Sequence, residues 1–233
     1  MYYRLFLTKR RGWESHMFDL GLVIAFAGIV GGRLWDVFFF DWEYYHNHLL
    51  EIPYIWQGGM AIQGGIIFAC IAAYFYLKKH QIPVLPFADT VTPGIILGQA
   101  IGRIANFMNG DAFGHPTGQD FGLLYPDTTL AYHTYGAQPL WPAEVWECQG
   151  DLLIFVLLLW YGCKTRAEGT TFCLYIMFYS LLRFFLENYR GDYGTLALGL
   201  KSAQLTSLAA FAGAFILFLY FHFKHKSKSG ISE

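Results

Sequence analysis

One stretch near the middle of the chain combines side chains that can bind an anion. It reads Gly102-Arg-Ile-Ala-Asn-Phe-Met-Asn-Gly-Asp111 and closes a long apolar run. On a helix, Arg103 and Asn106 are three residues apart and share a face. The pair Asn109-Gly110 is typical of a helix end. Because polar groups inside an apolar span are costly and by default mark a functional site, the stretch is the first candidate site.

A second group of polar side chains recurs at helical spacing in a later apolar run. Arg183 and Glu187 are spaced as an ion pair within one helix, so structure and function explain that pair equally well. For Arg190, reaching out to membrane headgroups is the better explanation. The whole stripe has four members and an opposite face of Leu and Phe: Tyr179, Arg183, Glu187 and Arg190.

Glycine pairs accompany two further candidates. Arg33 follows Gly31-Gly32, which predicts that a neighbouring backbone approaches closely, although reaching headgroups would also explain its charge. The segment Gly58–Gly65 places four glycines around Gln63. Such a start favours a loosened helix end that exposes backbone N–H groups to an anionic ligand.

The composition is that of a membrane protein. Of 233 residues, 55% are hydrophobic and 14% are charged, whereas a soluble domain is about 25% charged. The predicted fold class is all-α, a polytopic integral membrane protein with one transmembrane domain over residues 1–233. The net charge of -1 says nothing about nucleic acid, and no basic or aromatic stripe suggests that nucleic acid binds. The cysteines and histidines lack metal-ligand spacing, so neither a metal nor another cofactor is expected.

Apolar runs predict about six transmembrane helices of near-bilayer length. A small-xxx-small ladder at Gly94, Gly98 and Gly102 predicts tight packing of the third helix against a neighbour. The six spans run approximately over Met17–Arg33, Gln57–Leu77, Leu85–Phe107, Pro142–Cys163, Thr170–Glu187 and Ser202–Phe223.

Positive charge falls on one side of the membrane if these spans alternate. By the positive-inside rule that side is the cytoplasm, and the C-terminus lies there. Loops 34–56, 108–141 and 188–201 are then extracytoplasmic, and all candidate side chains lie near the outer leaflet. The positive clusters are Lys9–Arg11, Lys78–Lys79, Lys164–Arg166 and Lys224–Lys228.

Arginine is the side chain that suggests the ligand. Its planar fork matches phosphate oxygens in a bidentate way, and the abundant phosphate at the outer leaflet is a phospholipid headgroup. No GxSxG signature occurs, which disfavours a covalent serine intermediate. From the residues alone we expect a membrane-embedded site for an anionic phospholipid, with no reaction specified.

Six short elements in chain order carry a family resemblance, and the Gly102 block is the most specific. At these elements the chain resembles the prolipoprotein diacylglyceryl transferase family along most of its length. The elements are Gly31–Leu34 (GGRL), Gly58–Gly65 (GG-x3-HGG), Gly102–Asp111 (GR-x2-NF-x-NGE), Pro142–Glu147 (HP-x3-YE), Tyr179–Arg190 (Y-x3-R-x3-E-x2-R) and Ser202–Leu205 (S-x-GQ).

The resemblance implies an activity and its partners. The family moves a diacylglyceryl group from phosphatidylglycerol to the thiol of the lipobox cysteine in prolipoproteins, so that a thioether forms and glycerol phosphate leaves. It implies a bacterial cytoplasmic (inner) membrane protein with a site open to the outer leaflet. The partners would be phosphatidylglycerol, lipobox peptides and membrane lipids.

The same resemblance assigns roles to individual residues. Arg103 would hold the phosphate of phosphatidylglycerol, and Arg183 would stabilise the departing phosphate. Gln63 and Glu187 complete the expected catalytic set. The expected substrate-binding set is Arg103, Asn106, Asn109, Asp111, Tyr179, Arg190 and Arg33.

Four departures from the family pattern bear on catalysis. Gln63 stands where many members have histidine, and glutamine cannot take a proton, so the base is Asp111, Glu187 or a phosphate oxygen. Asp111 replaces a glutamate, and Trp141 replaces the histidine of HP-x3-YE. The family's first helix is missing before Lys9–Arg11, so either the start is placed late or the member is shortened.

Two alternative functions come from other classes of membrane protein, a lipid-binding protein and a permease. One is a catalytically impaired relative that binds phospholipid or lipoprotein precursor, suggested by the lost histidine and the missing helix. The other is a small anion permease, which expects charges spread through the membrane depth and often internal repeats. Here the charges gather at one end, which disfavours a permease.

Overall fold

The computed structural model describes residues 12–163, 167–191, 195–197 and 199–229, and most of them are helical. The positive clusters 9–11 and 164–166, on which the expected orientation partly rests, lie outside the described residues. The chain divides into two compact units, Met1–Phe87 and Ala88–Glu233. Each unit is described by itself, and the expectation of a single transmembrane domain stays a prediction.

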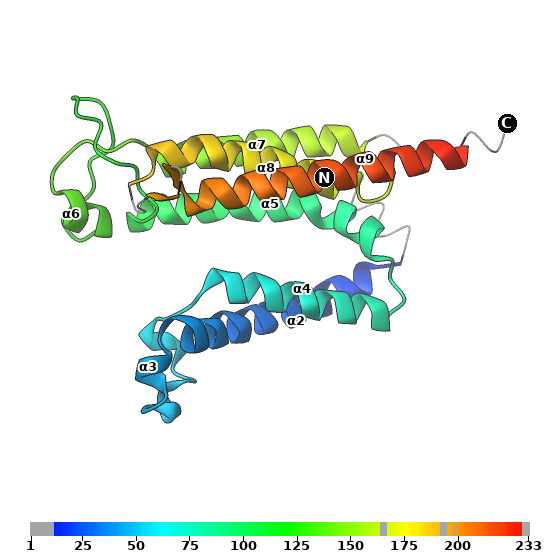
Figure 1. Ribbon diagram of the computed structural model, residues 1–233, viewed down its shortest axis with the longest axis horizontal. Coiled ribbons are helices and arrows are strands. Elements are labelled where there is room, and N and C mark those ends of the chain that lie inside the picture. The colour runs from blue at the N-terminus through cyan, green and yellow to red at the C-terminus, as the bar shows by residue number, and fades with distance from the viewer. Residues whose placement is uncertain (1–11, 164–166, 192–194, 198, 230–233) are drawn as a thin grey trace. The chain divides into compact units, whose positions relative to one another are not determined.

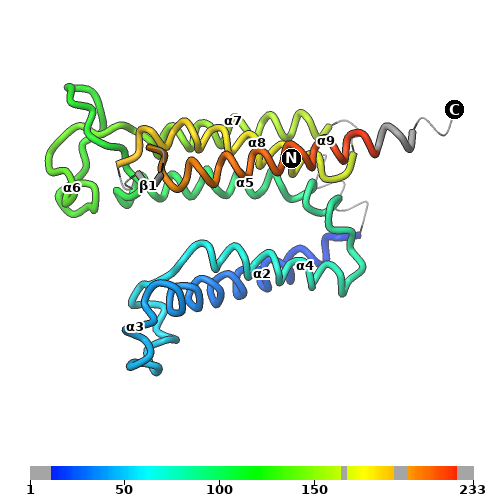
Figure 2. Tube along the Cα trace, in the orientation of Figure 1, coloured from blue at the N-terminus to red at the C-terminus, as the bar shows by residue number. Residues whose placement is uncertain are grey.

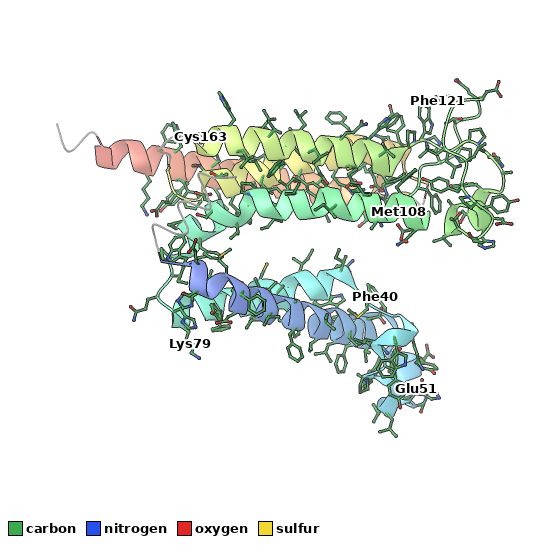
Figure 3. All side chains as sticks on the ribbon, turned by 180° about the vertical axis from the view of Figure 1, so that it is seen from behind. Phe40, Glu51, Lys79, Met108, Phe121 and Cys163 are labelled. Carbon is green, nitrogen blue, oxygen red and sulfur yellow. The ribbon has the colours of Figure 1, made fainter. Side chains whose placement is uncertain are left out.

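The first unit is a pair of long helices, α2 and α4, that pack side by side (Figure 1). Lys79 lies at one end of this pair, and Phe40 and Glu51 lie at the other end (Figure 3). A connection of short helical turns joins the two helices at that second end. The elements are α2 (Glu14–Trp35), η1 (Asp36–Phe40), α3 (Trp42–Tyr45), η2 (Leu49–Glu51), η3 (Ile55–Gln57) and α4 (Ile62–Lys79).

Glycines allow α2 and α4 to approach closely. A Cβ atom on Gly31 would overlap the side chain of Phe68 and the carbonyl of Gly64. A Cβ atom on Gly64 would overlap the Gly31 carbonyl and the Cβ of Trp35. The close backbone approach predicted for Gly31-Gly32 is therefore confirmed.

The second unit is built around long helices that run along one another (Figures 1 and 2). Helix α7 packs on α8, and α8 packs on α9. The apolar cluster of Ile96, Ile154 and Leu158 joins α5 and α7, and α8 packs against it. The elements are α5 (Val84–Asn109), α6 (Leu130–Tyr135), α7 (Ala143–Gly162), α8 (Thr170–Leu186), η4 (Glu187–Tyr189), β1 (Thr195–Ala197), β2 (Leu200–Lys201) and α9 (Ser202–Ser229).

Helix α8 begins on a carboxylate supplied from α5. The Asp89 oxygens accept hydrogen bonds from the backbone N–H of Gly169 at 2.7 Å and of Phe172 at 2.9 Å. A carboxylate satisfies the free N–H groups of a helix start and favours its positive dipole end. This contact fixes α8 against α5 at the end of the unit opposite the polar stripe.

Helix α5 ends where the sequence predicted. Its last residue is Asn109, and Gly110 follows with a φ of 67°, in the left-handed region that glycine adopts freely. The segment between α5 and α7 then folds around Phe113, Ala131 and Leu140. Figure 3 places Met108 and Phe121 at the same end of this unit, opposite Cys163.

Long helices occur at all six predicted spans, although not all are equally apolar. Among the described residues, four stretches are long and apolar enough to cross a membrane. Helix α4 has 18 residues and ends in two lysines, and α7 carries three carboxylates; neither meets that standard. The four stretches are Glu14–Phe40, Val84–Asn109, Thr170–Tyr189 and Ser202–Lys224.

The glycine ladder on α5 makes no close packing within its own unit. A Cβ atom at Gly94, Gly98 or Gly102 would meet nothing within 4 Å among the described residues of that unit. Glycine permits tight contacts between helices at Gly31 and Gly64, between α2 and α4, and at Gly150 on α7, which faces Leu182 of α8.

We predict that Gly64→Ala destabilises the α2–α4 pair. The added methyl has no space, and overpacking of this kind costs about 1–3 kcal/mol. Thermal unfolding in detergent would show a lower midpoint. The control is Gly21→Ala on α2, where a Cβ meets nothing within 4 Å; an equal midpoint for both variants would contradict the prediction.

Candidate functional site

One buried carboxylate, Glu147 on α7, receives arginines from other elements of the second unit. Its Oε1 lies 2.9 Å from Nη2 of Arg103 on α5. Its Oε2 lies 3.3 Å from Nη1 of Arg183 on α8 and 3.7 Å from Nη1 of Arg190 after η4. Glu147 is fully buried. A buried charge needs partners, and here three guanidinium groups provide them.

The two members of the stripe that lie on α8 face this carboxylate. Tyr179 donates its hydroxyl hydrogen to Glu147 Oε1 over 3.4 Å. Arg183 uses Nη2 for Glu187, at 2.8 Å, while its Nη1 faces Glu147. The Arg183–Glu187 pair is therefore one part of a larger network and does not simply neutralise itself.

The end of α5 orients Arg103 through a short polar chain. Arg103 donates from Nη1 to Asn106 Oδ1 at 3.2 Å, and Asn106 donates from Nδ2 to Asp111 Oδ1 at 2.5 Å. Because Nη2 is held by Glu147, the guanidinium is fixed at two points. Asn109 is exposed and does not join this chain in the described part of the molecule.

Arg190 is buried in the network, and so the expectation that it reaches out to headgroups is wrong. It is 5% exposed and faces Glu147. The backbone carbonyls of Arg190 and Glu187 accept hydrogen bonds from Lys201 Nζ, at 2.6 and 2.9 Å. Lys201 thus closes the turn that places Arg190 under the end of α8.

Arg33, in the first unit, has a different set of partners. Its Nε donates to the carbonyl of Ile52 at 2.8 Å, and its Nη1 donates to the carbonyls of Gly58 and Gly59 at 2.7 and 2.9 Å. Nη2 donates to the carbonyls of Glu51 and Tyr54. Arg33 therefore stabilises the connection between α2 and α4. A phosphate could bind this guanidinium only by displacing these carbonyls.

The glycine-rich start of α4 differs from its expected form for the same reason. Gly58 and Gly59 present carbonyl oxygens to a cation, whereas exposed N–H groups facing an anion were expected. Their positive φ angles, 93° and 72°, are what turn these carbonyls inward. Gln63 is exposed in the first turn of α4.

The sequence interpretation omitted four charged side chains of the second unit. In the sequence, Glu147 stands out only as part of a motif. The acidic residues at 144, 147 and 151 nevertheless repeat at helical spacing, which predicts that they share one face of the helix. All three are fully buried. Lys201 gave no such signal, because a short strand brings it back to the network. The four are Glu144, Glu147, Asp151 and Lys201.

The ion pairs of the second unit gather four cations. Glu147 and Glu187 share Arg103, Arg183, Arg190 and Lys201. Arginine stays protonated in proteins. The partly exposed forks of Arg103 and Arg183 suit an anion with several oxygens. No cluster of three or more metal-binding side chains occurs within the described residues.

A family model described as Prolipoprotein diacylglyceryl transferase matches residues 1–220. The chain belongs to this family. A phosphatidylglycerol–prolipoprotein diacylglyceryl transferase of Geobacillus kaustophilus is 38% identical over 202 residues, which is 85% of this chain and 74% of the relative. The relative of that name in Clostridioides difficile is 35% identical over 221 residues, 94% of this chain and 83% of its own. This chain is therefore a membrane transferase with bacterial relatives.

We predict that Glu147→Gln destabilises the transferase. Three guanidinium groups would lose their shared carboxylate, and removing one partner of a buried ion pair costs about 3–5 kcal/mol. Denaturant unfolding in micelles would measure the loss. Glu43→Gln, at an exposed glutamate, is the control. Equal stability of the two variants would argue against a central role for Glu147.

Proposed function

We propose that this transferase moves the diacylglyceryl group of phosphatidylglycerol to the thiol of a lipobox cysteine in prolipoproteins. A thioether forms, and glycerol phosphate leaves. Family membership supports the reaction class. The observation that carries the proposal is the convergence of Arg103 and Arg183 on one buried carboxylate, which aligns two phosphate-binding forks.

The network prepares the arginines for phosphate. The carboxylate of Glu147 presents two oxygens to guanidinium groups, as a phosphate would, and so holds Arg103 and Arg183 together before the lipid arrives. These two side chains keep 20% and 14% of their surface exposed, more than Arg190 with 5%. Arg103 would bind the phosphate of phosphatidylglycerol, and Arg183 would bind the phosphate as it departs.

The reaction needs this positive charge when the leaving group departs. When the carbon–oxygen bond breaks, its electron pair stays on glycerol phosphate, and the leaving group gains negative charge. Fixed donors in a site of low dielectric stabilise such developing charge strongly. Asn106 and Asp111 keep Arg103 in place, while Glu187 and Tyr179 keep Arg183 and Glu147 in place. Asn109 stays an expected substrate contact at the end of α5.

The location of the reaction is part of the same proposal. The transferase would lie in the bacterial inner membrane, with its C-terminus in the cytoplasm and its site at the outer leaflet. In the first unit, Lys79 lies at the opposite end of the α2–α4 pair from Phe40 and Glu51 (Figure 3), which supports one cytoplasmic and one outer end. Loops 34–56 and 108–141 would then be extracytoplasmic.

We predict that Arg103→Ala lowers diacylglyceryl transfer to a lipobox peptide by about 100-fold or more, as loss of one stabilising donor does elsewhere. Arg103→Lys should also be slow, because lysine keeps the charge and loses the fork. The measurement is the initial rate with phosphatidylglycerol vesicles, or lipid attachment in a strain that depends on this gene. Lys78→Ala, at an exposed cation, is the control. Full transfer by Arg103→Ala would refute the assigned role.

We predict a small effect for Gln63→Ala. Glutamine offers a hydrogen bond to substrate and no proton acceptor, so its loss should slow the same assay by about tenfold or less. A much larger loss would mean that Gln63 takes part directly in the chemistry.

A relative that binds lipid without transfer is the second candidate, and the glutamine at position 63 favours it. Purified protein would then bind phosphatidylglycerol in preference to phosphatidylcholine and leave a lipobox peptide unmodified through long incubation. Any time-dependent attachment of the diacylglyceryl group removes this candidate.

A further inference from the structure

A buried glutamate on α7 lies beside the arginine network without taking part in its ion pairs. Glu144, in the first turn of α7, is fully buried. It precedes Glu147 by three residues and so shares a helix face with it. It stands at one of the unspecified positions of the HP-x3-YE element, so the family resemblance assigns it no role.

The two oxygens of Glu144 have different surroundings. Oε1 accepts the hydroxyl hydrogen of Tyr125, which comes from the loop between α5 and α7. Oε2 is buried and has no hydrogen-bond partner within the described residues. A carboxylate with an unused buried oxygen is poorly stabilised as an anion, and this is what makes a carboxylate a good proton acceptor.

The neighbouring charges place this pair at the site. Glu144 interacts electrostatically with Arg190, Asp111 and Arg103, and Arg103 is the expected ligand of the phosphate. Tyr125 is half-buried, and its ring contacts Phe107 at a centroid distance of 6.5 Å. Tyr125 therefore contacts both the buried carboxylate, through its hydroxyl, and the end of α5, through its ring.

Other carboxylates near the arginines already have partners. Glu147 and Glu187 are held by ion pairs, and Asp111 accepts from Asn106. Asp151 has no hydrogen-bond partner in the described residues, but it is one turn deeper than Glu147, away from the outer end of α7.

We propose that Glu144, reached through the hydroxyl of Tyr125, is the proton acceptor for the thiol in this transferase, in place of a family histidine at position 63. The inference rests on the proposed function. The Tyr125 oxygen takes the S–H proton as its own proton moves to Glu144. Sulfur bonds to the glyceryl carbon, and the carbon–oxygen bond breaks with its electron pair on glycerol phosphate. Glu144 later releases its proton to water.

The test compares a cysteine peptide with a selenocysteine peptide. A selenol is ionised at neutral pH, so it needs no proton acceptor, whereas a thiol does. Glu144→Gln should transfer to the cysteine peptide about 100-fold more slowly than the wild type, the usual contribution of a general base, and transfer to the selenocysteine peptide at a rate within about threefold of it. Its rate on the cysteine peptide should also rise steeply with pH, as the fraction of thiolate in solution rises.

Two further variants keep the test decisive. Tyr125→Phe retains Glu144 and should show the same preference for selenocysteine, even where Glu144→Gln folds poorly. The matched control is the exposed pair in which Tyr44 donates to Glu51 at 2.7 Å. Tyr44→Phe and Glu51→Gln should treat both peptides as the wild type does.

The outcomes separate the two proposals. Equal rates of wild type and Glu144→Gln on the cysteine peptide would overturn this inference and leave the proposed function intact. Equal slowing of Glu144→Gln on both peptides would also overturn it, because that pattern indicates a structural or phosphate-binding defect. No transfer by the wild type to either peptide would overturn the proposed function and this inference with it.

Discussion

The second unit depends on the sharing of one buried carboxylate among cations from several elements. Glu147 has no access to solvent, and its charge is tolerated because Arg103, Arg183 and Arg190 face it. Each arginine depends on Glu147 in turn, because a buried cation without a partner would be costly. The positions of α5, α7 and the end of α8 are therefore tied to a single interaction.

The two units use arginine in opposite ways. The guanidinium of Arg33 donates hydrogen bonds to backbone carbonyls of the connection between α2 and α4. Its role is therefore to stabilise that connection. Arg103 and Arg183 are held by carboxylates that resemble a phosphate and keep part of their surface exposed. Exposure separates the arginines as well as partner type, because Arg190 also faces a carboxylate and yet is buried.

Spacing within one helix was predictable from the sequence, and contacts between helices were not. The Arg103–Asn106 contact, the helix end at Gly110 and the stripe on α8 all follow from helical periodicity. The central place of Glu147 depends on how α7 meets α5 and α8. The carbonyls around Arg33 could not be predicted either. Every residue has a backbone carbonyl, so the sequence does not show which of them converge on one side chain. Family resemblance supplied the reaction, which periodicity alone could not.

The distribution of these partners along the chain constrains how the protein is made. Arg103 is synthesised long before Glu147, and Arg183 and Arg190 follow still later, so Glu147 meets its three arginines at different times. A charged side chain at the centre of a lone helix costs about 2.5–3.5 kcal/mol during insertion. Helix α7, with its buried acids, is not among the four stretches apolar enough to cross alone. Burial of α7 among its neighbours therefore depends on cations from other parts of the chain, Arg103 before it and Arg183 and Arg190 after it.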